Sequence, residues 1–302
     1  KRKDEQMNYQ EFVGSVTGFL RESLPCGTKL EMIPLEKNNG VIMDGLSIRR
    51  QGQKVAPTIY MDAYYRDYLS GRSLKGICDQ ILECCEDKGF EERFDADFFT
   101  DYGKIRSTIV YKLINAEKNK DLLNRIPHLP FLDLAIVFYS LLLDTPMGNA
   151  TVLIHNSHMK LWKTGCSDLY RDAKENVKRL LPARLESMSE VIYELTGGQE
   201  RPEETGVPMY VLTNRSRAFG AACILYDGVL ESCAERFGES FYMLPSSVHE
   251  VIMVPASAVG NEEELTSMVR DINRTQVRDT EILSDNVYLY SPVSGQFTLV
   301  KA

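Results

Sequence analysis

Two arginines beside an asparagine, in the stretch Asn214-Arg215-Ser216-Arg217, have the side chains needed to hold an anion. Guanidinium groups make charge-assisted, often bidentate hydrogen bonds to carboxylates and phosphates. Residues 209–213 and 221–225 on either side are predicted to be strands, and loops between rigid strands often carry binding residues. A solvated polar turn is the competing interpretation. We nevertheless predict that Asn214, Arg215 and Arg217 bind an anionic group.

A serine, a histidine and a carboxylate lie close together further along, in the string SSVHE at residues 246–250. These are the components of an activated nucleophile, so Ser247, His249 and Glu250 are candidate catalytic residues of a hydrolase. The sequence contains no G-x-S-x-G turn, which presents the nucleophilic serine in many hydrolases. The favoured interpretation is therefore a serine-rich turn with His249 on the face of a strand.

Two histidines in the string IHNSHMKLW could share a metal ion if this segment is helical. These are His155 and His158, and either His249-Glu250 or Asp133 could complete the ligand set. No H-E-x-x-H or comparable metal signature is present. The alternative is that both histidines satisfy backbone groups at the end of a strand. No cofactor is predicted, and a metal-dependent enzyme stays open as an alternative.

The net charge of −8 at pH 7 argues against nucleic-acid binding, which requires a surplus of Lys and Arg to displace counterions. It equally disfavours an anionic membrane surface. The longest apolar run, residues 134–143, is interrupted by Ser140 and falls well short of the roughly 20 residues that span a bilayer. The expected partner is thus a protein or an anionic small molecule, with no nucleic acid and no membrane.

Cysteine usage indicates a reducing compartment. The chain has seven cysteines, an odd number, and none are arranged as C-x-x-C. Buried, reduced thiols of this kind are typical of cytoplasmic proteins. The polar residues 1–10 also lack the apolar core of a signal peptide, so a cytoplasmic location is expected.

The pattern of the 302 residues predicts an α+β fold of antiparallel sheets with helices packed on one face. Residues 1–104 are expected to form an N-terminal lobe of a helix, a three-stranded meander and further helices. Residues 105–302 are expected to form a second α+β lobe with a loop at residues 197–208, which are rich in Gly, Pro and Glu. A strand-turn-strand-helix unit is predicted to recur at residues 41–69, 131–180 and 209–238.

Residues 207–255 form the segment in which local signals agree best. They predict, in order, a strand, a loop, a strand, a helix and two further strands. Asp227 is the expected N-cap of the helix and Gly238 its C-terminal residue, because the apolar positions between them share one helical face. The candidate binding residues therefore lie in a loop of a well-defined folding unit, and the candidate catalytic residues lie between its last two strands.

Five strings are distinctive beyond their secondary structure: NNGVIMDGLSIRR, APTIYMDAYY, IPHLPFLDLAIVFY, MYVLTNRSRAFGAACILY and LPSSVHEVIMVP. Together they resemble an uncharacterised family, a domain of unknown function that recurs in anaerobic Gram-positive bacteria. The resemblance extends over residues 8–290. It implies a bacterial, cytosolic protein and no assigned activity, cofactor or catalytic residue.

The sequence leads to one principal hypothesis and one alternative. The principal hypothesis is a non-catalytic intracellular protein that binds an acidic small molecule or a protein partner. The alternative is a metal-dependent or Ser/His hydrolase that uses His155, His158, His249 and Glu250. The positions of these histidines in space decide between the two, because a catalytic or metal site requires them to converge.

Overall fold

The computed structural model describes residues 6–53, 55–86, 94–145, 148–199, 207–245 and 247–300. By its contacts the chain divides into two compact units. The first unit comprises residues 1–37, 41–105 and 142–150, and the second comprises residues 38–40, 106–141 and 151–302.

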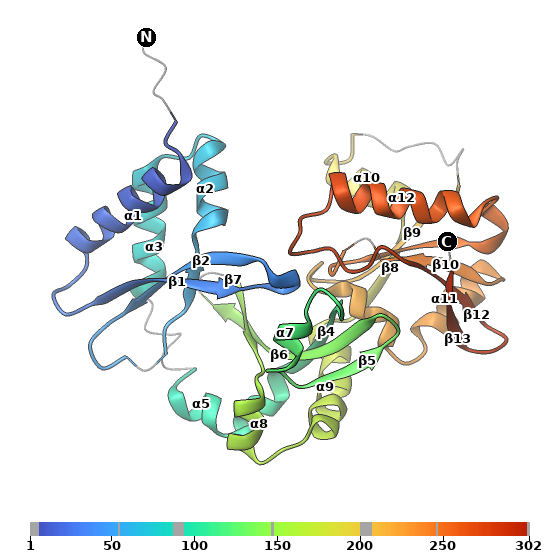
Figure 1. Cartoon of the computed structure of the whole chain (residues 1–302), viewed down its shortest axis with the longest axis horizontal. Helices are drawn as coiled ribbons and strands as arrows, with labels where there is room; N and C mark the ends of the chain where they lie inside the picture. Colours follow the sequence, from blue (N-terminus) through green and yellow to red (C-terminus); the bar gives the residue numbers. More distant parts are fainter. Residues whose placement is uncertain are drawn as a thin grey trace, which may run out of the picture. The chain divides into compact units, whose positions relative to one another are not determined.

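Helices pack on a three-stranded antiparallel sheet in the first unit, with strand order β1-β2-β3 (Figure 1). Helix α1 begins with a capping box, in which Asn8 and Glu11 each accept a hydrogen bond from the backbone N–H of the other. The core contains Phe12, Val16 and Leu20 of α1 together with buried residues of β2, β3, α2 and α3. The elements of this unit are α1 (Tyr9–Ser23), β1 (Lys29–Glu36), β2 (Ile42–Arg49), β3 (Thr58–Tyr60), α2 (Met61–Leu69), α3 (Leu74–Glu86), α5 (Ala96–Thr100) and α6 (Tyr102–Ile105).

Two further antiparallel sheets follow, and they lie in the second unit except for the end of β6 and the start of β7, which fall within residues 142–150 of the first unit. In the smaller sheet the strand order is β4-β6-β5, with β7 paired to β6, and in the larger sheet it is β13-β12-β10-β11-β9-β8. The strands are β4 (Ile109–Asn115), β5 (His128–Phe131), β6 (Leu134–Thr145), β7 (Gly148–Leu153), β8 (Ala183–Ser187), β9 (Tyr210–Asn214), β10 (Phe241–Leu244), β11 (Val251–Pro255), β12 (Val287–Ser291) and β13 (Gln296–Val300). The helices are α7 (Lys120–Leu123), α8 (Asn156–Trp162), α9 (Cys166–Leu180), α10 (Met188–Leu195), η3 (Gly220–Leu225), α11 (Val229–Phe237) and α12 (Glu262–Thr275). The predicted α+β class with antiparallel sheets is confirmed.

Side-chain alternation along β10 explains how the larger sheet is covered. Tyr242 joins the apolar cluster that contains Leu265 and Val269 of α12. Its neighbour Phe241 points to the opposite face, since successive residues of a strand alternate, and its ring lies 5.4 Å from that of Phe237 in α11. Helices α12 and α11 therefore pack on opposite faces of this sheet.

The strand predicted at residues 221–225 is wrong, because this segment forms the 3-10 helix η3. Both sides of β9 are already occupied, by β11 and β8, so no place in the sheet is left next to β9. The apolar run is buried all the same, with Ala221, Ala222 and Cys223 almost fully shielded. A short apolar run fits a buried helix as well as a buried strand. The third copy of the predicted repeat consequently lacks its second strand.

Strand β8 is absent from the prediction. Its charged residues Arg184 and Glu186 give this edge strand the composition of a polar segment.

The predicted N-cap Asp227 of the helix in residues 207–255 is also wrong. Helix α11 starts after Gly228, whose φ is 77°, and the Asp227 carboxylate instead pairs with Lys174 at 2.7 Å. Gly238 ends the helix as predicted, in a left-handed conformation with φ of 73°.

Part of the predicted loop at residues 197–208, namely residues 200–206, lies outside the described residues, as does Ser246. In the described part of the chain, no helix has both the length and the apolar character needed to cross a membrane.

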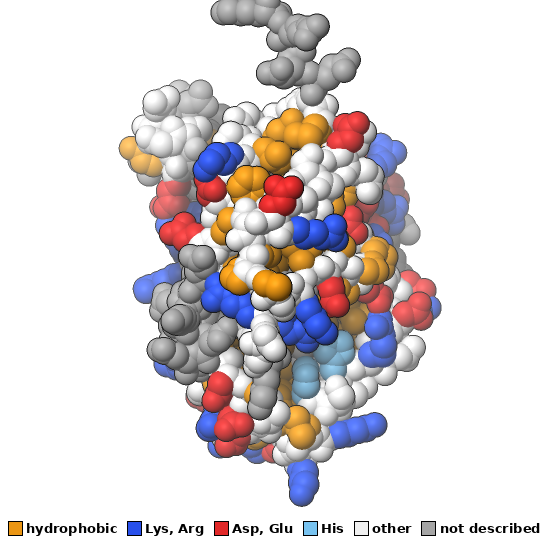
Figure 2. Space-filling view, turned by 90° about the vertical axis from the view of Figure 1, so that its left-hand side faces the viewer, with side chains coloured by type: hydrophobic (Ala, Val, Ile, Leu, Met, Phe, Trp, Pro, Cys, Tyr) orange, Lys and Arg blue, Asp and Glu red, His pale blue; other side chains and the backbone are white. Residues whose placement is uncertain are grey.

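Cys223 and Cys233 are buried thiols, and burial raises their pKa values to about 12 and about 11. On the face of the molecule shown in Figure 2, basic and acidic side chains are interspersed.

Candidate functional site

One cavity of about 420 Å³ in the second unit brings together side chains from three separate segments. It includes Arg217 from the predicted binding loop and the candidate catalytic residues Ser247, His249 and Glu250. The third segment follows the end of α12. The structure thus brings Arg217 next to the candidate catalytic residues, which begin 30 positions further along the sequence. The lining residues are Arg217, Ser247, His249, Glu250, Gln276, Val277, Arg278 and Glu281.

The loop that carries Arg217 is shaped by Asn214 at the end of β9. Its side-chain oxygen accepts hydrogen bonds from the backbone N–H groups of Ser216 and Ala218, and its amide donates to the Ala218 carbonyl at 2.8 Å. Asn214 is fully buried. Its side chain is therefore used to form an Asx turn that reverses the chain and presents Arg217.

Two residues of this loop have the left-handed backbone conformation that disfavours side chains, namely Arg217 with φ of 48° and Phe219 with φ of 55°. Such a conformation costs roughly 1–2 kcal/mol per residue. Contacts of the Phe219 ring offset the cost. It stacks on His249 at 5.5 Å, meets the edge of Tyr139 at 5.3 Å and lies 4.2 Å from the Lys112 ammonium. The loop is thus held in a conformation that it would not adopt by itself.

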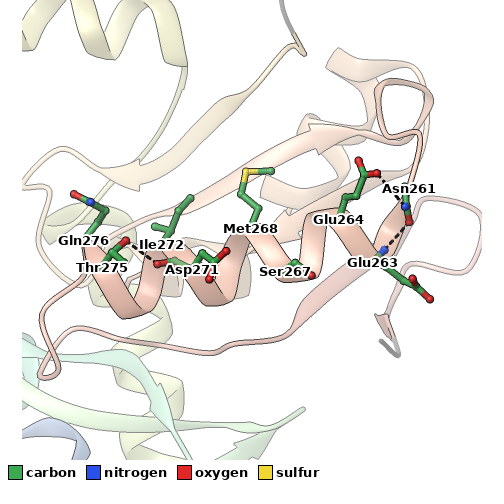
Figure 3. Close-up of a pocket in the computed structure, with 9 residues that line it drawn as sticks. All are labelled: Asn261, Glu263, Glu264, Ser267, Met268, Asp271, Ile272, Thr275 and Gln276. Atoms are coloured by element: carbon green, nitrogen blue, oxygen red, sulfur yellow. Dashed lines mark hydrogen bonds between the residues drawn. The ribbon is translucent and has the colours of Figure 1, made fainter.

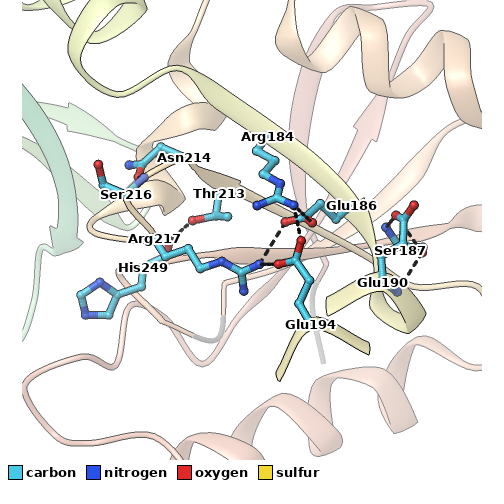
Figure 4. A network of polar contacts seen from close by, with 10 residues as sticks. All are labelled: Arg184, Glu186, Ser187, Glu190, Glu194, Thr213, Asn214, Ser216, Arg217 and His249. Atoms are coloured by element: carbon cyan, nitrogen blue, oxygen red, sulfur yellow. Dashed lines mark hydrogen bonds and ion pairs between the residues drawn. The ribbon is translucent and has the colours of Figure 1, made fainter. Parts of the chain in front are cut away.

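Arg217 belongs to a quartet of charges with Arg184, Glu186 and Glu194, which come from β8 and α10 (Figure 4). Its Nη2 lies 2.6 Å from a Glu194 oxygen and 3.3 Å from a Glu186 oxygen. Arg184 pairs with the same two carboxylates at 2.5 Å. Burial raises the pKa of Glu186, whereas the charge of Arg184 opposes this rise. The quartet therefore cross-links loop, strand and helix at the margin of the cavity.

Arg215 is placed differently from its neighbours. Its backbone N–H donates to the Pro182 carbonyl at 3.1 Å, while the residue itself is exposed and does not line the cavity. Of the three predicted binding residues, the structure brings only Arg217 into the cavity.

Replacing Arg217 with alanine is expected to lower the free energy of unfolding by about 1–2 kcal/mol, because the buried Glu186 loses one of its two cationic partners. Arg215→Ala is the matched control and should change stability by less than about 0.5 kcal/mol, as is usual for exposed residues. Chemical denaturation followed by circular dichroism measures both. Equal stability of the two variants would show that the quartet contributes nothing to folding.

The serine and histidine of the cavity are not arranged as nucleophile and base. Ser247 Oγ donates to the Glu250 carboxylate at 2.9 Å and accepts from the His249 backbone N–H. The imidazole Nδ1 accepts from the Phe219 N–H at 3.2 Å, and Nε2 faces Glu281 at 3.4 Å. Both ring nitrogens are therefore directed at groups other than Ser247, which leaves none to take its proton.

The other two candidate histidines, His155 and His158, lie at the start of α8 and serve local structure. His158 Nδ1 accepts a hydrogen bond from the His155 backbone N–H at 3.1 Å, and the His158 ring stacks on Trp162 at 5.3 Å. Burial lowers the pKa values of both histidines. Among the residues that the structure describes, no three His, Cys, Asp or Glu side chains are grouped so that they could hold a metal ion. The structure thus does not bring His155, His158 and His249 together.

A larger groove of about 680 Å³ runs along α12 (Figure 3). Its described lining consists of residues of α12 and of the two residues that flank this helix, Asn261 and Gln276, with Met268 exposed at 45%. No loop from another part of the fold contributes a cationic or nucleophilic group to this lining. The smaller cavity, with side chains from three segments, is the better candidate for a functional site.

Sequence reasoning missed the third wall of the cavity, formed by Gln276, Val277, Arg278 and Glu281. The only available signal was a pair of charged residues just beyond a well-capped helix, where loops often carry function. Phe219 was missed as well, because nothing in its local sequence indicates the left-handed backbone that places its ring on His249.

Comparison with known proteins agrees with the resemblance read from the sequence. No curated protein and no solved structure matches the chain. A family model does match, and it covers residues 9–292, nearly the whole length. The chain therefore belongs to DUF5688, a family of unknown function.

Proposed function

We propose that this protein is a non-catalytic binding protein whose cavity holds the anionic group of a small acidic molecule. The observation that carries the proposal is the convergence of Arg217 and Arg278 on one cavity from loops far apart in sequence. Among the described residues, the ion pairs of both arginines run through Nη2. Because a guanidinium has five N–H donors, Nε and Nη1 stay available for a bidentate carboxylate or phosphate.

Two carboxylates of the cavity narrow the class of ligand. Glu250 and Glu281 lie in the same lining as the arginines, so the charge of the cavity is balanced rather than strongly positive. A bare polyanion would meet repulsion from these carboxylates. A molecule with one acidic group and additional hydroxyl or amino donors matches the lining better, since the donors can bind the glutamates.

The hydrogen bonds of the cavity support binding rather than catalysis. The proton of Ser247 is directed at Glu250, and the His249 ring is held by Phe219 and Glu281. An acidic side chain of a protein partner would satisfy the same arginines, and this is the second occupant that the proposal allows. The buried thiols of Cys223 and Cys233 support a cytoplasmic location, where thiols stay reduced.

A ligand screen by thermal shift, with carboxylates and phosphates at constant ionic strength, tests the proposal. Binding of the best hit is then measured calorimetrically for Arg278→Ala. The variant should lose about 1–3 kcal/mol of binding free energy, the value of a charge-assisted hydrogen bond. Its control is Arg274→Ala, because Arg274 pairs with Asp271 three residues away just as Arg278 pairs with Glu281, yet does not line the cavity.

Two results would contradict the proposal. One is a screen in which no acidic molecule or acidic peptide raises the melting temperature. The other is a ligand that binds wild type, Arg274→Ala and Arg278→Ala with equal affinity, which would place it outside the cavity.

A further inference from the structure

The two edges of the six-stranded sheet differ in their chemistry. At one edge, β8 carries Arg184 and Glu186, both within the charge quartet, and continues directly into α10. Charged residues on an edge strand discourage the addition of a further strand. At the other edge lies β13, which has no charged residue and no proline in its sequence QFTLV. The side chains of β13 therefore include none of the charged residues or prolines that usually discourage the addition of a further strand.

Apolar side chains extend the surface beside β13. The Phe297 ring contacts Tyr290 at 5.3 Å and Phe131, at the end of β5, at 6.2 Å. Leu299 points to the same face as Phe297, two residues along the strand, and is 41% exposed. Leu132, next to Phe131, is 46% exposed. The edge of the sheet is thus bordered by an accessible apolar surface.

We propose that β13 is a self-association edge, at which a second copy of this chain adds its own β13 in antiparallel orientation. A two-fold axis through Thr298 would pair Thr298 with its own copy. Phe297 would lie opposite Leu299 of the second copy, and Gln296 opposite Val300. The two large sheets would then form one continuous sheet across both copies.

The occupant is a second copy because the strand is complementary to itself. In the proposed two-fold antiparallel pair, Thr298 lies opposite its own copy, and Phe297 and Leu299 each lie two residues from theirs. A charge at any of these three positions would therefore have a like charge nearby. QFTLV contains none. The central Thr–Thr pair and the flanking aromatic–aliphatic pairs are combinations that stabilise antiparallel strands. In this register the exposed Leu299 of each copy would contact Phe297 of the other copy.

Sedimentation velocity of the chain over a range of concentrations tests the proposal, with a dimer expected for wild type. Leu299→Lys should raise the dimer dissociation constant at least tenfold, because it places two ammonium groups beside the axis. The control is Val293→Lys, since Val293 is 97% exposed in the turn before β13 and lies outside the paired strand. It should leave the dimer intact.

Thr298→Lys provides an independent test if Leu299→Lys fails to fold, as judged by circular dichroism. Thr298 is exposed and would place two like charges directly opposite each other. A wild-type protein that stays monomeric at its highest soluble concentration would overturn the proposal, and would leave a strand from another protein as the occupant of this edge. A dimer that persists in both folded lysine variants would overturn it as well.

Discussion

Replacing Asp133 with alanine is expected to lower the free energy of unfolding of the second unit by about 3–5 kcal/mol. The Asp133 carboxylate accepts hydrogen bonds from Ser284 at 2.7 Å, from Asn286 at 2.9 Å and from the Tyr288 hydroxyl. Burial raises the pKa of Tyr288, so its hydroxyl keeps the proton that it donates. Alanine would leave the donors of Ser284, Asn286 and Tyr288 without their acceptor. These hydrogen bonds link the turn between β5 and β6 to the residues at the start of β12.

Urea denaturation followed by circular dichroism measures the effect. The control is Asp279→Ala. Asp279 is exposed, and among the described residues its hydrogen bond is made through the backbone carbonyl, which alanine retains. It should change stability by less than about 0.5 kcal/mol. A loss below about 1 kcal/mol for Asp133→Ala would mean that water replaces the carboxylate without penalty.

Gly220→Ala is expected to destabilise the same unit by about 3 kcal/mol or more. A Cβ atom at this position would lie 2.2 Å from Thr213 Oγ1, 2.5 Å from the His249 carbonyl oxygen and 2.7 Å from the Asn214 nitrogen. Two of these three atoms belong to the backbone of β9 and of the segment before β11, so no rotamer change relieves the clash. The variant should also bind the ligand of the cavity less tightly, since His249 would be displaced.

The matched control for this substitution is Gly260→Ala. Gly260 has no heavy atom within 4 Å of the ideal Cβ position and no left-handed backbone. Thermal unfolding of both variants separates a steric effect at Gly220 from the general effect of replacing glycine. Equal melting temperatures would show that the loop next to η3 moves aside at little cost.

Elements with a strong local signal could be predicted from the sequence. Strands β10 and β11 lie within residues 207–255, where the sequence predicts two strands after a helix, and Gly238 ends that helix as predicted. The segment at residues 221–225 could not be identified, because its apolar run fits a buried helix and a buried strand equally well. Only the tertiary fact that β9 already has two neighbours excludes a strand there.

The candidate site, too, could be predicted from the sequence only in part. Arg217, Ser247, His249 and Glu250 could each be singled out by residue type, and all four line the cavity. Their hydrogen bonds could not be predicted, since the partners Glu186, Glu194 and Glu281 come from distant segments. Local sequence indicates which residues are able to act, whereas the long-range contacts decide how each one is used.

The quartet of Arg184, Glu186, Arg217 and Glu194 has a consequence for how sequences of this family can diverge. Each charge neutralises two others, so a single replacement leaves a surplus charge beside the buried Glu186 carboxylate. Coupled residues of this kind do not contribute additively. We therefore expect the four positions to change together in related sequences, because the loss of one arginine is better tolerated when a glutamate is lost with it.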